Sequence, residues 1–197
     1  LLEDAMGLPL RDHGFHTYAE YRTWPEDARY ELIDGRAYAM APAPAIVHQE
    51  LLGELFRQIS DQLDGSHCRT FIAPIDVRLP KLDEADDRVE TVVQPDLLVV
   101  CEPHKIDERG IRGAPDWVIE ILSPRTAGHD QVIKRAVYEG HGVREYWLVH
   151  PVDKVVTVYR LAAGTYGKPH VQELIGESIC EAVSGVTIDW ARATRRI

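Results

Sequence analysis

The chain has 197 residues, of which 45% are hydrophobic and 27% charged, and its formal net charge is −10. This length suits one well-packed domain and is short for two. The acidic balance disfavours a simple nucleic-acid-binding module, which holds the phosphate backbone with a basic surface, but counts less against a nuclease whose site acids are balanced by bound cations.

The composition also bears on the cellular compartment of the protein and on the redox state of its cysteines. No apolar run approaches the roughly 18 residues that a membrane span needs, so we expect no membrane contact. The three cysteines, Cys68, Cys101 and Cys180, are odd in number and far apart. This pattern predicts neither a disulfide framework nor a zinc site, and favours reduced, buried thiols in a cytoplasmic protein.

The N-terminal part predicts an arm and a hairpin. Residues 1–16 are mixed and irregular, so we expect a single domain over residues 17–197. A short helix is predicted at 17–22, where Thr17 and Glu20 have the spacing of a capping box. Asp34-Gly35 then separates two short strands, which is a strong signal for a two-residue hairpin turn. Glu31 lies in the first of these strands, where an exposed acid is the simplest interpretation.

A long helix is predicted at 45–63, because leucine, phenylalanine and isoleucine recur there at helical spacing on one face. His48 lies on the shoulder of this apolar stripe, where a packed or capping histidine is common. Strands are expected at 69–72 and 75–79, bent at Pro74. The remaining chain predicts a helix at 130–139 and strands at 144–149, 155–161 and 171–175, which together indicate a mixed α/β domain.

Two apolar segments of strand length each carry one carboxylate. Asp96 lies in the segment 92–101 and Glu120 in the segment 116–122. A carboxylate loses hydration in such a setting, and two on neighbouring strands would raise each other's pKa unless a cation lies between them. Lys134 follows in the next helix. Two acids and a lysine are typical of a magnesium-dependent phosphodiesterase site, although solvent-facing acids and a surface Asp130–Lys134 ion pair also fit the pattern.

Several segments resemble the Uma-two family of endonuclease-like proteins, in the PD-(D/E)XK restriction-endonuclease-like superfamily. They occur in the family's order from about residue 18 onward. The matching pieces are residues 30–35, His48, and residues 73–78, 94–97, 111–116, 120–124 and 142–147.

The resemblance implies an α/β/α sandwich with a central mixed β-sheet. It assigns Asp96 and Glu120 as metal-binding acids and Glu31 as a further acid near the site. The chain departs from the superfamily motif at Leu122, where a lysine is expected. The resemblance suggests that this lysine has moved to the following helix, which here carries Lys134.

The function expected from these residues is hydrolysis of DNA by a Mg²⁺-dependent endonuclease, with Mn²⁺ as a substitute. Gln94, Ser123 and His48 would position water or substrate. The alternatives are a non-catalytic or weakly active domain that binds nucleic acid or protein on the same fold, and a nuclease acting on RNA. Cutting both strands of a duplex is compatible with a homodimer.

Overall fold

The computed structural model describes residues 2–3, 9–25, 29–40, 45–123 and 128–197. The sequence also predicts a turn at residues 25–27, a rigid connector at 41–44 and a short return at 123–128, and these three segments lie partly or wholly outside the described residues. Within the described part of the chain, no helix is both long and apolar enough to cross a bilayer.

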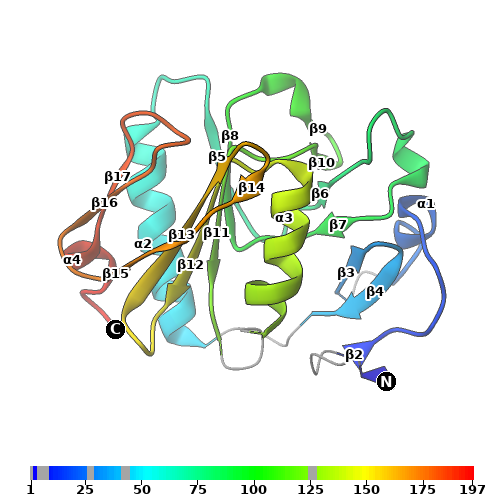
Figure 1. The fold of residues 1–197 in the computed structure, drawn as a ribbon, viewed down its shortest axis with the longest axis horizontal. Coiled ribbons are helices and arrows are strands. Elements are labelled where there is room, and N and C mark those ends of the chain that lie inside the picture. Colours follow the sequence, from blue (N-terminus) through cyan, green and yellow to red (C-terminus); the bar gives the residue numbers. More distant parts are fainter. Residues whose placement is uncertain (1, 4–8, 26–28, 41–44, 124–127) are drawn as a thin grey trace.

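Within the described residues, most strands belong to two sheets (Figure 1). The N-terminal sheet has the order β1 (Leu2–Glu3), β2 (Pro9–Leu10), β4 (Arg36–Ala39), β3 (Tyr30–Ile33), β7 (Val92–Val93), β6 (Val77–Arg78), β10 (Gly110–Arg112), β9 (Ile106–Asp107). The central sheet has the order β14 (Thr165–Tyr166), β13 (Val155–Ala162), β12 (Glu145–His150), β11 (Trp117–Ile121), β8 (Leu97–Val100), β5 (Arg69–Ile72), and β15 (His170–Glu173) also pairs with β13. A separate ribbon joins β16 (Glu177–Ile179) to β17 (Thr187–Asp189).

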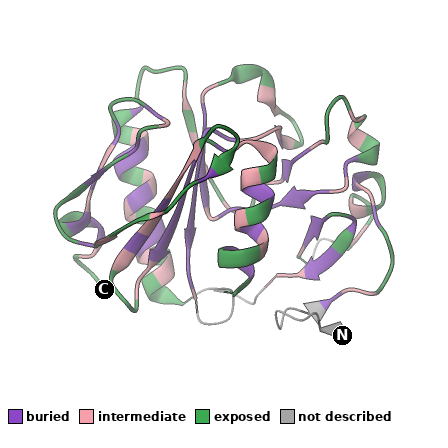
Figure 2. Ribbon diagram, in the orientation of Figure 1, coloured by how far each residue is buried: buried purple, intermediate pink, exposed green. Residues whose placement is uncertain are grey.

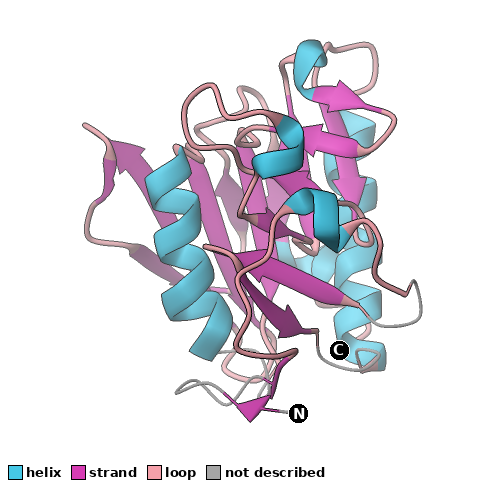
Figure 3. Ribbon diagram, turned by 90° about the vertical axis from the view of Figure 1, so that its right-hand side faces the viewer, coloured by secondary structure: helices cyan, strands magenta, loops and turns pink. Residues whose placement is uncertain are grey.

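The described helices lie on both sides of these strands (Figure 3). They are α1 (Tyr18–Tyr21), α2 (Ile46–Gln62), the 3-10 turns η1 (Asp86–Arg88) and η2 (Pro103–Lys105), the π-helix η3 (His129–Lys134), α3 (Arg135–His141) and α4 (Trp190–Ala193). The central sheet is mixed, because β11 pairs with β12 in parallel and with β8 antiparallel. The predicted α/β/α sandwich with a mixed sheet is confirmed.

Both faces of the central sheet are covered, which explains why β8 and β11 are buried along their whole length and apolar at every position except Glu120 (Figure 2). One face packs its alternate residues, such as Trp117 and Ile119, against α2. The other face packs Val118 and Leu98 against α3 and the N-terminal sheet. Because side chains alternate along a strand, the even-numbered Asp96 and Glu120 point toward this second face.

Three local expectations are wrong in detail. The strand predicted at 92–101 divides into β7 and β8, which belong to different sheets. Pro95 lacks the N–H needed to continue a ladder, so the chain crosses between sheets at Gln94–Asp96. The helix predicted at 130–139 begins as a π-helix. Thr17 makes no capping hydrogen bond, because Glu20 contacts the ring of His16 instead.

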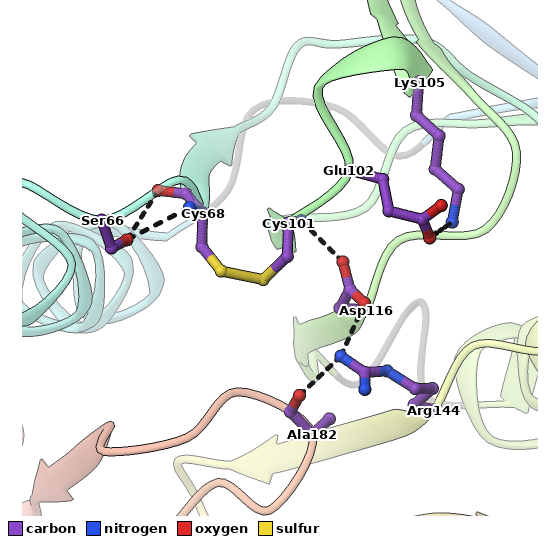
Figure 4. Close-up of a disulfide and its surroundings, with 8 residues drawn as sticks. All are labelled: Ser66, Cys68, Cys101, Glu102, Lys105, Asp116, Arg144 and Ala182. Carbon is purple, nitrogen blue, oxygen red and sulfur yellow. Dashed lines mark hydrogen bonds and ion pairs between the residues drawn. A yellow bond between two sulfur atoms is a disulfide. The ribbon is translucent and has the colours of Figure 1, made fainter.

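The cysteine prediction is also wrong, since Cys68 and Cys101 form a disulfide (Figure 4). The pairing of β5 with β8 brings Arg69 opposite Val100, and the two cysteines are the next residues outward on each strand. That register could not be read from the spacing of the cysteines alone. Cys180 is free and buried.

Candidate active site

A pocket of about 170 Å³ opens where the two sheets, α2 and η3 meet. Every residue expected to belong to the site lines it. Its lining includes Glu31, His48, Gln94, Asp96, Glu120, Ser123 and Lys134, together with Arg29, Tyr38, Gln49, His129 and Asp130.

Asp96 and Glu120 lie on neighbouring segments, since β8 and β11 pair with Leu97 opposite Ile119. Each acid accepts a hydrogen bond from the other's segment. The backbone N–H of Asp96 donates to Glu120 Oε2 at 3.2 Å, and that of Ile121 donates to Asp96 Oδ2 at 2.8 Å. The Asp96 side chain keeps 22% exposure, whereas Glu120 is only 2% exposed. Asp96 therefore faces the solvent side of the pocket, and Glu120 lies behind it.

Lys134 is buried between the acids. Its Nζ lies 2.9 Å from Glu120 Oε1 and 3.0 Å from Glu31 Oε1, with Asp130 Oδ1 at 3.6 Å. The ammonium therefore joins β3 of one sheet to β11 of the other. A lysine in a solvated helix pair with Asp130 alone would be exposed, but Lys134 is 4% exposed.

The charges of the cluster shift its protonation. Burial raises the pKa of Glu120 well above its usual range, and the nearby negative charge of Asp96 adds to the rise. Burial alone would lower the pKa of Lys134, but the surrounding carboxylates, led by Glu120, hold it well above its usual value. Burial would likewise raise the pKa of Glu31, but the Lys134 ammonium and His129 lower it to about 2. The site thus keeps a charged lysine and a charged Glu31.

The residues expected to position water or substrate have distinct surroundings. His48, in α2, has its Nε2 3.1 Å from Asp96 Oδ2, and its Nδ1 is buried without a hydrogen-bond partner among the described residues. The side-chain amide of Gln94 donates to Asp76 at 2.9 Å and its oxygen accepts from Arg29 at 2.9 Å. Its backbone N–H donates to Glu31 Oε1 at 2.8 Å. Ser123 lines the pocket at the end of β11.

Sequence reasoning missed two residues that contact the acids. His129 is buried, and its Nε2 lies 3.2 Å from Glu31 Oε2. Tyr138 donates its hydroxyl hydrogen to Glu120 Oε1 at 2.9 Å. The i, i+4 spacing of Lys134 and Tyr138 was a usable signal for the tyrosine. No sequence signal marks His129, because it enters the pocket through a π-helical turn, a feature often found at functional sites.

The set of donors fits a divalent metal ion. Asp96 and Glu120 supply carboxylate oxygens, the ligands that hard cations prefer. Four carboxyl groups and two cationic side chains line the described pocket, which is an excess of two negative charges when all four carboxyl groups are ionised and both histidines are neutral. No cysteine is among the described residues that line it. The grouping of His67, Cys68 and Cys101 lies elsewhere, and its two sulfurs are bonded to each other.

Comparisons with known proteins show the family and the fold of the chain. The family model Uma2, described as "Putative restriction endonuclease", matches residues 18–191. The Synechocystis sp. protein slr1290, which is named as uncharacterized, is 27% identical over 143 residues, covering 71% of each chain. A crystal structure of a "putative nuclease belonging to DUF820" from Anabaena variabilis superposes with a TM-score of 0.71 at 22% identity, covering 91% of this chain and 97% of that one. Because the family model spans most of the described fold and its pocket, the chain belongs to the Uma2 family, whose description is "Putative restriction endonuclease".

Proposed function

We propose that the protein is a Mg²⁺-dependent endonuclease that hydrolyses phosphodiester bonds of DNA. The observation that carries this proposal is that the pocket holds two more carboxyl groups than cationic side chains, beside the buried ammonium of Lys134. A structural ion pair needs no such excess, whereas a divalent cation would balance it. The family and the fold agree with a nuclease.

Asp96 and Glu120 are the residues that would hold Mg²⁺, and Mn²⁺ has the same preference for oxygen ligands. A metal ion bound there would polarise the scissile phosphate and lower the pKa of a bound water.

The chain's own residues then supply orientation and charge. Lys134 offers a fixed ammonium that stabilises negative charge developing on the phosphate. Glu31 and Glu120 hold that ammonium in place from two sides. His48 fixes the Asp96 carboxylate through its Nε2, and Gln94 fixes Glu31 through its backbone N–H. Ser123 lies at the pocket wall, where its hydroxyl can bind water or a phosphate oxygen.

Nicking of supercoiled plasmid tests the proposal. We expect cleavage with Mg²⁺ or Mn²⁺, none with chelator, and at least a hundredfold loss for Asp96→Asn. Asp153→Asn, which neutralises an exposed acid far along the chain, serves as the matched control. Nicking that survives in Asp96→Asn at the wild-type rate would refute the assignment.

Two other functions remain to be separated by experiment. A non-catalytic binding domain on this fold is favoured by the net charge of −10, and predicts binding without metal-dependent nicking. A nuclease for RNA predicts faster digestion of RNA than of duplex or single-stranded DNA in parallel assays. We propose DNA because the family description names restriction endonucleases.

Three further expectations belong to the same proposal. Two cuts on opposite strands suit a homodimer, which light scattering of the purified protein tests. The division into residues 1–16 and 17–197 is tested by limited proteolysis. A location in the cytoplasm is tested by cell fractionation. The Cys68–Cys101 disulfide argues against this location, because disulfides are uncommon in a reducing compartment.

A further inference from the structure

A second hollow of about 630 Å³ lies beside the candidate active site, between the outer face of α2 and the C-terminal residues around α4. We call it the basic groove. It is lined by Ile46, Gln49, Glu50, Gly53, Glu54, Arg57, Arg192, Ala193, Arg195 and Arg196. Gln49 lines both the groove and the candidate active site. The two hollows are therefore neighbours that share a wall.

The groove is positively charged in an acidic protein. Four arginines line it against two glutamates, while the whole chain carries −10. Glu54 is shared between Arg57, at 2.6 Å, and Arg192, at 3.5 Å. Arg195 and Arg196 are exposed, and no carboxylate among the described residues lies within ion-pair distance of either. These two guanidiniums are free to bind an external anion.

We propose that the basic groove binds the phosphate backbone of the nucleic-acid strand that continues from the candidate active site. This inference rests on the proposed nuclease function. Arginine forks match phosphate oxygens in geometry as well as in charge. The shared residue Gln49 and the distal Arg57 lie about 12 Å apart along the axis of α2, which equals the axial rise of roughly three to four base steps of a duplex.

Gly53 shapes the floor of this groove. It lies in the middle of α2, where glycine weakens a helix relative to other residues. A Cβ built at Gly53 meets no heavy atom within 4 Å, so packing does not require the glycine. Because glycine has no side chain, it leaves the surface of α2 unobstructed between Gln49 and Arg57, where the nucleic-acid strand would lie.

Salt-dependent binding tests the proposal. The probe is a short fluorescein-labelled DNA duplex, measured by anisotropy in Ca²⁺ to suppress cleavage. Removing two phosphate contacts by Arg195→Ala/Arg196→Ala should reduce the slope of log affinity against log salt by about 1.8. Between 50 and 200 mM salt the wild type should therefore lose about twelvefold more affinity than this variant. The control is Arg88→Ala/Lys168→Ala, which removes two exposed charges elsewhere and should leave the slope near its wild-type value.

A second pair of variants separates groove binding from folding. Gly53→Glu and Gly53→Gln both improve helix propensity, so both should fold at least as well as the wild type. Only Gly53→Glu adds a negative charge, and it should bind the duplex several-fold more weakly than Gly53→Gln. Glu50→Gln, which removes a negative charge from the groove, should bind more tightly.

The outcomes are separable from those of the proposed function. A reduced salt slope in the arginine variant supports the groove even if the wild type never nicks plasmid, which would overturn only the proposed catalysis. Unchanged slopes in a protein that does nick plasmid would overturn the groove alone. Absence of duplex binding by the wild type at low salt would also overturn it, as would equal affinity of Gly53→Glu and Gly53→Gln.

Discussion

Replacing Lys134 by methionine is the sharpest perturbation of the site. Methionine keeps a flexible chain of similar length and removes only the ammonium. In the structure that ammonium lies within 3.0 Å of both Glu31 and Glu120 and has almost no contact with water. The variant therefore leaves buried carboxylates without their cation, a loss that a solvent-exposed lysine would not cause.

The expected cost follows from this burial. Removing one partner of a buried ion pair costs about 3–5 kcal/mol, which in a chain of this size lowers the melting temperature by roughly 6–20 °C. Burial would raise the pKa of Glu31, and the Lys134 ammonium is the main influence that lowers it to about 2. Without Lys134 this pKa rises, so the destabilisation is largest at alkaline pH and shrinks as the carboxylates take up protons.

Urea unfolding in chelator at pH 7, followed by the fluorescence of the buried tryptophans, measures this cost. The double variant Glu31→Gln/Lys134→Met removes one orphaned charge, so it should recover at least about 1 kcal/mol relative to Lys134→Met. Plasmid nicking by Lys134→Met should be abolished even where the variant remains folded. A Lys134→Met protein whose free energy of unfolding stays within about 0.5 kcal/mol of the wild type would refute the buried-cation argument.

Three further predictions concern the acids and the long helix. Asp96→Asn relieves repulsion among the site acids, so its melting temperature in chelator should be higher than that of the wild type. Mg²⁺ at tenfold its dissociation constant should stabilise the wild type by about 1.4 kcal/mol and should not stabilise the variant. The lowered pKa of Glu31 stabilises the fold by about 3 kcal/mol above pH 4.5, and this contribution is lost as pH falls from 4.5 toward 2. Urea titrations at pH 5 and pH 3 should therefore show a lower free energy of unfolding at pH 3 in the wild type. Glu31→Gln should lack this part of the pH dependence. Gly53→Ala should stabilise by about 0.5–1 kcal/mol in thermal melts, whereas Gly142→Ala, at a φ of 87°, should destabilise.

Local signals predicted much of the fold because the physics behind them is local. Asp34-Gly35 adopts the two positive φ angles, 47° and 76°, that its hairpin turn requires. The apolar stripe of α2 lies on the central sheet as its spacing predicts. Pro95 was a local signal for a break within residues 92–101, but the sheet that each half joins depends on where β3, β6 and β11 lie in space and not on propensity.

The candidate site likewise contains residues that the sequence could predict and residues that it could not. The cost of burying charge indicated that Asp96 and Glu120 need a nearby cation, and the family resemblance, rather than this cost, pointed to Lys134 as its source. His129 and the Cys68–Cys101 disulfide depend on long-range register, which no spacing along the chain encodes. The π-helical turn at η3 rotates His129 toward Glu31, and an ordinary helical pattern gives no indication of it.

Leu122 shows why the cation can come from the helix in this chain. It points to the same face of the sheet as Glu120, two residues earlier, because side chains alternate along a strand. There it is buried in one cluster with Val137 and Tyr138 of α3. This packing holds the helical segment on the sheet, and the same segment presents Lys134 to Glu120. The leucine that replaces the expected lysine therefore fixes the element from which the charge is supplied.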